Sequence, residues 1–470
     1  MPVADLLPEI ALLLGAVVII LGSSFVPQRQ LAWMAGVALL VIVIAIALCM
    51  RQWGGTPRLT FSGVWALDDL TIATKLIVLA AGAAVLPLCP AWLQSDPRHG
   101  EFYALLLFAL LGVIMLASAS DSMQLVVGML LSSVASYPLA AFHRRWAPAL
   151  EAGMKYFLVG ALTNSLLCIG VVLLFGITGE TGYQQIAASL ALDHDSLALA
   201  VGAGCIVLGL TFKLAAFPAH AWMPDVAQGS PAPAAALLTV VPKIGAAMAL
   251  TRFVSLLPEE FDTQLLVALL AAATMTLGNL AALWQSDVRR LLGWSAVAQS
   301  GYALMAVAVL GASPDAMPSL LIFLATYAIA NLAAFAVIVH LRGRTALDDY
   351  GGLTREAPLA ALVLILALLS LTGIPPLIGF FGKLLLFRAA LDGGYTWLAI
   401  LAVINTALSL FYYLRVIGRM VFGRTQHPVY ILEGPWPRAV LVLGVLLLVA
   451  GGLGMQWLMA RLAGASLLPV

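Results

Sequence analysis

All five lysines of this chain lie within or at the edge of long apolar stretches, and every positive charge in its polar connections is an arginine. An ammonium at the centre of a membrane-spanning helix costs roughly 2.5–3.5 kcal/mol on insertion scales. Apolar surroundings disfavour the charged form of lysine, so a buried lysine can release and regain a proton. The pattern therefore predicts a membrane protein that moves protons. The five are Lys75, Lys155, Lys213, Lys243 and Lys383.

Two of these lysines lie next to residues that interrupt helices and a third lies in the middle of a span, and we predict that all three transfer protons. Lys213 comes five residues before Pro218, Lys243 directly follows Pro242, and Lys383 follows a glycine-rich stretch. The alternative for each is a lysine whose ammonium snorkels to the membrane surface. The neighbouring helix breaks and the depth of Lys243 in its span favour proton transfer.

Other ionisable residues are weaker candidates. Glu151 and Lys155 are spaced i, i+4 near the start of a span, which fits either a proton relay or a structural ion pair at the cytoplasmic edge. His220 has a near-neutral ordinary pKa that suits a relay, although a hydrogen-bonded packing histidine has the same pattern. We expect Asp225 to cap a helix or pair locally, and Lys75, near the start of its span, to snorkel.

Composition places the chain in the integral-membrane class. Of its 470 residues 63% are hydrophobic and 10% are charged, and the mean hydropathy is +1.04, whereas about a quarter of a soluble domain is charged. The fold predicted is therefore an all-α polytopic membrane protein, with residues 1–470 forming a single integral membrane domain. The four cysteines show no metal-binding spacing and no nucleotide-binding glycine motif is present, so no cofactor or metal site is predicted in this chain. A net charge of +1 gives no indication of nucleic-acid binding.

The apolar runs predict about fourteen transmembrane helices at about 20 residues per crossing. The seventh (197–223) and the twelfth (357–391) contain helix-breaking residues, and we predict that both are discontinuous. Irregular backbone at membrane depth persists only where protein buries it or where it lines a wet cavity. Lys213 and Lys383 each fall on the fourth helix of a five-helix block, 102–257 and 263–422. Because each block has an odd number of crossings, the two would form inverted repeats.

Arginine placement predicts the orientation. Connections after odd-numbered helices hold ten arginines, and those after even-numbered helices hold four. By the positive-inside rule the odd connections are cytoplasmic and both termini lie on the outer, periplasmic side. The ten are Arg29, Arg98, Arg144, Arg145, Arg289, Arg290, Arg342, Arg344, Arg355 and Arg424, and the four are Arg51, Arg58, Arg252 and Arg388.

Several stretches together resemble the antiporter-like membrane subunits of respiratory complex I, and the subunit N branch in particular. The resemblance extends over nearly the whole chain. The opening Leu7-Pro8-Glu9 and a lysine at position 383 favour subunit N over its siblings. The matching stretches are Phe212-Lys213-Leu214, Pro218-Ala219-His220-Ala221-Trp222, Pro224-Asp225-Val226, Gly229-Ser230-Pro231-Ala232-Pro233, Arg289-Arg290-Leu291-Leu292-Gly293-Trp294-Ser295, Gln299-Ser300-Gly301-Tyr302, Leu371-Thr372-Gly373-Ile374-Pro375 and Gly379-Phe380-Phe381-Gly382-Lys383.

The resemblance implies fourteen helices in two inverted repeats and a proton path along a central polar axis. Lys213, Lys243 and Lys383 match the family's lysines on helices seven, eight and twelve, and Glu151 and Lys155 match an EAxxKY-like stretch. It further implies a translocase subunit that couples quinone reduction elsewhere in an NADH–quinone oxidoreductase to proton transfer. NADH, FMN, iron–sulfur clusters and quinone would then be handled by partner subunits. The expected surroundings are subunit M, small membrane subunits and the lipid of a bacterial inner membrane.

One position departs from the family pattern. Leu130 stands where the family has a glutamate on its fifth helix, the partner of the helix-seven lysine. If this half of the protein conducts protons, an acid from elsewhere, such as Glu151 acting through water, must stabilise protonated Lys213. Alternatively this half is silent. Restoring the acid with Leu130→Glu is expected to raise the proton affinity of the lysine.

Three other functions fit the same residues. They are an Mrp-type cation/proton antiporter subunit, a membrane subunit of a related hydrogenase or carbon dioxide-uptake complex, and a structural subunit whose channel has decayed.

Overall fold

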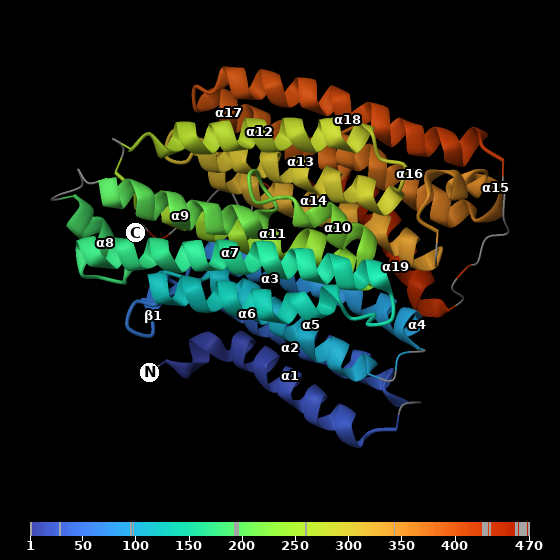
Figure 1. Ribbon diagram of the computed structural model, residues 1–470, viewed down its shortest axis with the longest axis horizontal. Helices are drawn as coiled ribbons and strands as arrows, with labels where there is room; N and C mark the ends of the chain where they lie inside the picture. Colours follow the sequence, from blue (N-terminus) through green and yellow to red (C-terminus); the bar gives the residue numbers. More distant parts are fainter. Residues whose placement is uncertain are drawn as a thin grey trace.

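The computed structural model is a bundle of long helices that run roughly side by side (Figure 1). It describes residues 2–27, 30–94, 96, 98–191, 197–258, 261–342, 344–424, 431, 434–455, 459 and 468, and Arg29 lies outside these residues. One two-stranded hairpin, β1 (Arg58–Thr60) and β2 (Trp65–Leu67), is the only sheet in the described ranges. The all-α membrane fold predicted from composition is confirmed, but the hairpin and the short amphipathic helix α8 were not predicted.

The helices follow one another with short connections. Their bounds are η1 (Val3–Leu6), α1 (Leu7–Phe25), α2 (Trp33–Gln52), α3 (Asp69–Val85), η3 (Leu86–Leu88), α4 (Cys89–Leu93), α5 (His99–Ala117), α6 (Ser122–Ala140), α7 (Ala147–Thr178), α8 (Tyr183–Leu190), α9 (Leu197–Leu214), α10 (Trp222–Gly229), α11 (Ala232–Val254), α12 (Thr263–Leu283), α13 (Val288–Ala308), α14 (Ala316–His340), η5 (Leu347–Tyr350), α15 (Leu353–Glu356), α16 (Pro358–Thr372), α17 (Ile378–Asp392), α18 (Thr396–Phe422) and α19 (Pro435–Leu453).

Within the described residues, 13 helices are long and apolar enough to cross a membrane. The helices α16 and α17 have 15 residues each and follow one another across residues 373–377. At 1.5 Å per residue neither spans a bilayer core of about 30 Å, but the two in succession do. Together they are long enough for one further crossing, which would bring the number to the fourteen predicted.

The first helix break follows Lys213. α9 ends at Leu214, the backbone is non-helical over residues 215–221, and α10 begins at Trp222. A break exposes carbonyls that need donors. The indole of Trp222 donates to the carbonyl of Phe212 at 3.0 Å, and the Ser300 hydroxyl donates to the carbonyl of Leu214. Side chains therefore satisfy the backbone that the break frees.

The second break separates α16 from α17. Gly373 takes a left-handed conformation (φ +93°), which favours glycine, and a Cβ there would lie 3.2 Å from the Lys383 side chain. Lys383 Nζ donates to the freed carbonyl of Thr372 at 3.1 Å. In both breaks the non-helical backbone thus lies next to a buried lysine.

The two five-helix blocks share a backbone arrangement at the start of their second helices. In the first block, Asp121 caps α6, and the amide of Ser122 donates to the carbonyl of Thr181 at 2.8 Å. In the second, Asp287 caps α13, and the amide of Val288 donates to the carbonyl of Thr345 at 2.7 Å. Each aspartate also forms an isolated β-bridge, to Gly182 and to Ala346 respectively.

Glycines give the blocks a second common feature. A Cβ at Gly128 of α6 would collide with the backbone of α5, and one at Gly301 of α13 would collide with the backbone of α12. The first two helices of each block therefore pack with their backbones in close approach, a contact that small residues permit in membrane bundles.

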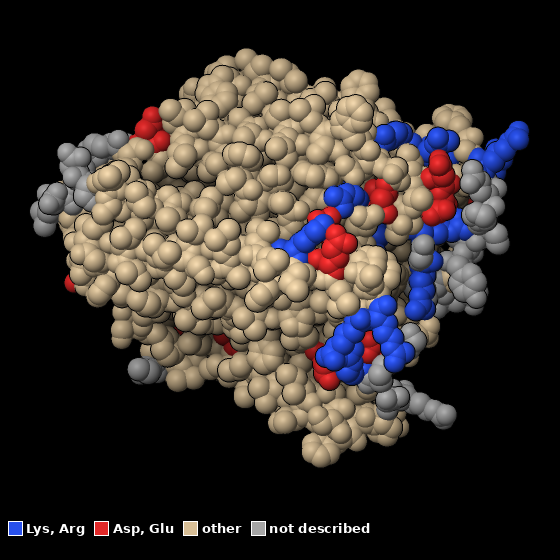
Figure 2. Space-filling view, in the orientation of Figure 1, with Lys and Arg blue, Asp and Glu red and all other residues tan. Residues whose placement is uncertain are grey.

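Charge is distributed unequally between the two ends of the bundle. Lysine and arginine side chains gather at the end where α10 and α15 lie, while the opposite end of this face shows only acidic side chains (Figure 2). Three arginines at that opposite end are each paired with an acid: Arg58 with Asp5, Arg252 with Asp68, and Arg388 with both Asp315 and Asp392. The bundle therefore has one end with an excess of positive charge and an opposite end where these three arginines are neutralised.

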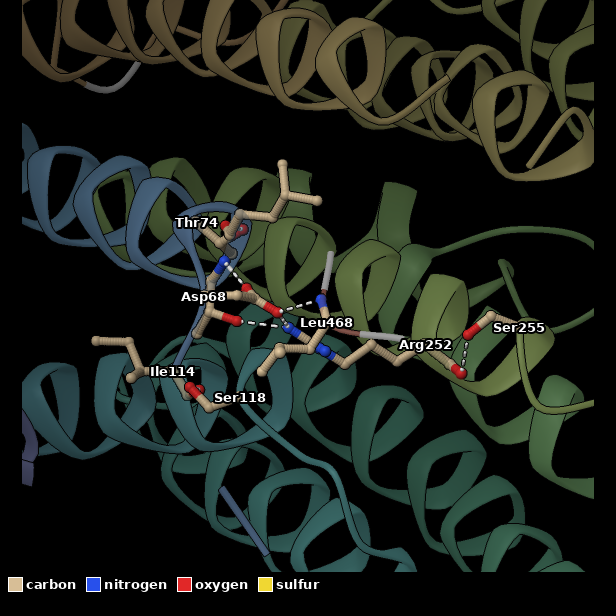
Figure 3. Close-up of polar contacts among 9 residues, drawn as sticks. Asp68, Thr74, Ile114, Ser118, Arg252, Ser255 and Leu468 are labelled. Carbon is tan, nitrogen blue, oxygen red and sulfur yellow. Dashed lines mark hydrogen bonds and ion pairs between the residues drawn. The ribbon is translucent and has the colours of Figure 1, made fainter. Parts of the chain in front are cut away.

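A buried ion pair joins α3 to α11 at the end with neutralised arginines (Figure 3). Asp68 caps α3 and pairs with Arg252, whose guanidinium also donates to the Thr71 hydroxyl at 2.7 Å. The backbone amide of Leu468 donates to the same carboxylate at 3.2 Å. Burial alone would raise the pKa of Asp68, but the charge and hydrogen bonds of Arg252 outweigh it and hold that pKa below its ordinary value.

We predict that Arg252→Met destabilises the folded protein by roughly 3–5 kcal/mol, because it leaves a buried carboxylate without its partner. The double variant Asp68→Asn/Arg252→Met should recover much of this loss. Since the pKa of Asp68 is held low, its contribution is present at neutral pH and is lost only as the pH falls below about 4. Thermal unfolding of the purified protein measures this, and a double variant no more stable than Arg252→Met would contradict it.

Candidate proton-transfer site

Three lysines lie deep in the interior of the bundle. Lys213 on α9, Lys243 on α11 and Lys383 on α17 are exposed by 0%, 2% and 3% respectively. Among the described residues none of the three forms an ion pair with a carboxylate. Burial at this level excludes snorkelling for these side chains. An unpaired ammonium in such surroundings is costly.

Aromatic side chains surround Lys213. Its Nζ donates to the Tyr156 hydroxyl at 3.3 Å and lies 5.6 Å from the centre of the Tyr156 ring. Tyr156 stacks on Trp222, with ring centroids 4.2 Å apart, so the break after Lys213 also fixes its partner. From α6, Ser136 lies beside Tyr156, and Tyr137 meets it edge to face.

Lys243 is held by α13. Its Nζ donates to the Ser300 hydroxyl at 2.7 Å and to the carbonyl of Ala296. The Tyr327 ring of α14 lies 5.9 Å from the same ammonium. Ser300 in turn donates to the carbonyl of Leu214, the residue after Lys213. One serine therefore connects the backbone beside Lys213 to the side chain of Lys243.

Lys383 borders a small cavity. Its Nζ lies 4.3 Å from the centre of the Tyr302 ring and donates to the freed carbonyl of Thr372. The cavity has a volume of about 10 Å³, close to what one water molecule requires. Gln299 and Tyr327 line it together with Lys383. Since Tyr327 also faces Lys243, the cavity lies between the second and third lysines.

These contacts define a polar axis of Lys213, Ser300, Lys243, Tyr327 and Lys383. It crosses from one five-helix block to the other through the middle of the bundle. The Ser300 hydroxyl contacts the Lys243 amine and the backbone beside Lys213, and the water-sized cavity borders Lys383. Hydroxyl groups and water are groups that can pass a proton on by exchanging hydrogen bonds.

Glu151 and Lys155 lie away from this axis at the positively charged end. Their ion pair has an N–O distance of 2.6 Å, and Lys155 also binds Asp225 at 2.9 Å. Arg290 pairs with the other oxygen of Asp225. Glu151 is 65% exposed, so this group is a surface ion-pair network, as the structural alternative predicted. It does not supply Lys213 with a carboxylate.

His220 lies in the irregular segment after Lys213 but does not point to a lysine. Its ring stacks with that of Phe217 and lies 5.7 Å from the Trp294 ring. In the described part of the chain no hydrogen bond or ion pair joins His220 to the polar axis. Its contacts are those of a packing histidine.

Comparison with known proteins identifies the chain. The family described as "NADH:quinone oxidoreductase/Mrp antiporter, TM" matches residues 119–409. A relative from Mycobacterium sp. (strain JLS), named NADH-quinone oxidoreductase subunit N, is 45% identical over 87% of this chain and 87% of its own length. Another from Streptomyces griseus, named NADH-quinone oxidoreductase subunit N 1, is 42% identical over 96% of both chains.

The chain belongs to the NADH-quinone oxidoreductase subunit N family. A chain in the structure of respiratory complex I from Thermus thermophilus with bound aureothin is 32% identical, with a TM-score of 0.85 over 98% of this chain and 100% of that one. A chain of the Mrp complex from Dietzia has a TM-score of 0.83 at 22% identity over 99% and 97% of the two chains, a likeness of fold. The predicted family is therefore confirmed.

The position of the missing family glutamate lies away from Lys213 in this subunit N protein. Leu130 is 40% exposed on the outer side of α6. The α6 side chains that reach Tyr156 are Ser136 and Tyr137, which follow Leu130 by six and seven residues, about 10 Å along a helix. This geometry argues against the expectation that a glutamate at position 130 would contact the lysine directly.

The prediction that Lys75 snorkels is wrong. Its side chain is fully buried and lies 2.6 Å from Glu9 of α1. The reason is that Glu9, only 4% exposed, supplies a carboxylate inside the bundle, so Lys75 gains more from pairing than from reaching the surface. Both residues precede the segment that the family matches. The Pro-Glu motif near the N-terminus was the available signal, because a glutamate in an apolar run needs a partner.

We predict that Ser136→Asp reduces proton translocation by the subunit, because a carboxylate beside the Tyr156 hydroxyl would stabilise protonated Lys213. Leu130→Glu adds the same charge to the same helix on its exposed side and should have a smaller effect. Proton uptake by proteoliposomes that contain the assembled oxidoreductase provides the measurement. A larger effect from Leu130→Glu would show that the family's acid position still acts on Lys213.

Proposed function

We propose that this chain is a proton-translocating membrane subunit of a bacterial NADH-quinone oxidoreductase, and that protons pass along the axis of Lys213, Lys243 and Lys383. The observation that carries this proposal is the burial of three lysines along one polar axis, none of them paired with a carboxylate among the residues that the structure describes. The names of the relatives, NADH-quinone oxidoreductase subunit N, indicate that electron transfer from NADH to quinone drives this proton transfer. NADH oxidation and quinone reduction then take place in partner subunits.

Each transfer step conserves charge locally. An ammonium releases its proton to a neighbouring hydroxyl or water and becomes a neutral amine, which later accepts a proton from the other side. Because burial disfavours the ammonium and hydrogen bonds to Tyr156, Ser300 and the Thr372 carbonyl favour it, small movements of these partners can shift the balance. The irregular backbone next to Lys213 and Lys383 can accommodate such movements.

The two blocks, 102–257 and 263–422, act in this proposal as inverted repeats. The matching Asp121 and Asp287 caps and the matching glycine contacts support a duplication. The end with excess arginine is then cytoplasmic, and the end where Asp68 binds both Arg252 and Leu468 is periplasmic. The protein lies in the inner membrane with both termini outside, beside an antiporter-like subunit M and small membrane subunits.

We predict that Lys383→Ala lowers the number of protons moved per electron pair in proteoliposomes that contain the assembled complex. Arg388→Ala, on the exposed side of the same helix, is the matched control and should leave this number unchanged. Assembly and electron transfer to quinone measured in detergent should stay near the parent values for both. An unchanged proton count in an assembled Lys383→Ala complex would contradict the proposal.

The variant Lys213→Ala tests whether the first five-helix block conducts protons or is silent. The absence of a nearby carboxylate favours a lysine that holds its proton only briefly, and we predict a partial loss of translocation that is smaller than the loss from Lys383→Ala. The same vesicle assay measures both variants. A Lys213→Ala complex that pumps normally would show that the first block is silent.

A further inference from the structure

An apolar groove lies on the outside of the bundle, at the end where arginines gather. Its walls are the start of α2, the segment from η3 to α4 and the start of α19, and its volume is about 410 Å³. α4 lies at the same end of the bundle as α15 (Figure 1). Each lining residue is a glycine, alanine, proline, leucine or tryptophan, and they include Trp33, Gly36, Leu39, Pro87, Pro90 and Trp436. We call this hollow the Trp33 groove.

The groove is open because a helix changes course opposite a small residue. α3 ends at Val85, and the chain continues through the 3-10 segment η3 into the short helix α4, with prolines at positions 87 and 90. Proline lacks the amide that a continuous helix needs. On the opposite wall α2 has Gly36, where a Cβ would meet no atom within 4 Å. The volume lies within the range of small-molecule sites, about 300–1,000 Å³.

The Trp33 groove runs inward from the membrane surface. Trp33 is the first residue of α2, and Leu39 follows six residues later, about 9 Å along the helix. Trp33 and Trp436 stand on two different walls and are 77% and 63% exposed. Exposed tryptophans gather where the hydrocarbon of a bilayer meets its head groups. The groove therefore extends from the head-group level into hydrocarbon, where water does not fill an apolar hollow.

Positive charge lies beside the groove. Arg438 follows Trp436 by two residues on α19, and its side chain is exposed. Arg342 lies over the ring of Trp92, two residues after Pro90 on α4, at 5.7 Å from the ring centre. Within the part of the chain that the structure describes, neither arginine forms an ion pair with a carboxylate. An apolar groove next to unpaired cations fits a molecule with an anionic head and an apolar tail.

The shape of the groove favours a flexible chain over a helix of another subunit. The rings of Trp33 and Trp436 project from the surface on either side of the recess at Gly36. A helix is rigid and about 10–12 Å wide with its side chains, so it would meet these rings before it reached the glycine. A single acyl chain can pass between them.

We propose that the Trp33 groove binds an anionic phospholipid from the arginine-rich side of the membrane. One acyl chain lies against Gly36 between α2 and α4, and the phosphate pairs with Arg438. Basic hollows between transmembrane helices are typical sites for anionic lipid head groups. The site lies apart from the lysine axis, and its occupation does not depend on proton transfer through Lys383.

The test uses phosphatidylglycerol with a photoreactive diazirine on one acyl chain, added to the assembled oxidoreductase in detergent. Peptide mass spectrometry then locates the label, which is expected on residues 32–39 and 86–90. Gly36→Leu places a side chain in the open space of the groove and should remove most of this label. Gly418→Leu of α18, where a Cβ also meets no atom within 4 Å, is the matched control and should leave the label unchanged.

The charge of the head group is tested separately. Arg438→Gln should raise the probe concentration for half-maximal labelling about fivefold, whereas Arg355→Gln, which removes another exposed arginine at the same end, should not change it. A zwitterionic phosphatidylcholine probe should label the groove more weakly and respond less to Arg438→Gln. Electron transfer to quinone in detergent should stay near the parent value in all four variants.

Three results would overturn the proposal. Labelling that persists in Gly36→Leu would show that the lipid binds elsewhere. Equal labelling by the two probes, with no effect of Arg438→Gln, would show that the site does not select an anionic lipid. No label on either segment is the result expected if a helix of another subunit covers the groove. None of these results bears on the role of Lys383, which the proton count of Lys383→Ala tests by itself.

Discussion

The arrangement of this protein depends on keeping three amines in an apolar interior without carboxylate partners. Transfer of an isolated ammonium into such surroundings is among the most costly steps that a side chain can undergo. Lys213, Lys243 and Lys383 meet this cost with tyrosine rings, hydroxyls and a backbone carbonyl. Those partners carry no negative charge, so they stabilise the ammonium less than a buried carboxylate would.

The broken helices follow from the same requirement. A continuous helix uses most of its carbonyls internally, whereas a helix that ends leaves its last carbonyls free for other donors. By ending α16 at Thr372, the chain frees the carbonyl that accepts from Lys383. By ending α9 at Leu214, it frees one for Ser300, the serine that binds Lys243. Proline and glycine at these places therefore supply acceptors at membrane depth, and surrounding helices bury the irregular backbone.

Residue type and spacing were sufficient to predict the elements that interrupt helices and the lysines beside them. The breaks at 215–221 and 373–377 coincide with Pro218 and with Gly373 to Pro376, whereas Pro242 lies inside the continuous helix α11, so proline favours a break without requiring one. Repeated capping at Asp121 and Asp287 was also present in the sequence as two Ser-Asp pairs before an apolar run, but two residues are too few to establish a repeat.

Pairing between distant helices could not be predicted from spacing. Lys75 was expected at the surface because its partner Glu9 lies 66 positions away on another helix. The buried hydrogen bonds of Ser295 with Tyr413 and of Tyr412 with Asn279 were not predicted for the same reason, since each joins two helices that are distant in the sequence. For Leu130 the family pattern indicated only which position replaces the glutamate. The packing of α6 shows that the side chain at this position faces outward.

The central claim is that the lysines share one hydrated axis, and the most direct measurement is the position of ordered water in a high-resolution cryo-electron microscopy map of the assembled oxidoreductase. The account predicts density for at least one water in the cavity between Gln299, Tyr327 and Lys383, within about 3 Å of the lysine amine. A dry cavity, with the amine bonded only to the Thr372 carbonyl and no water between Lys243 and Lys383, would contradict it.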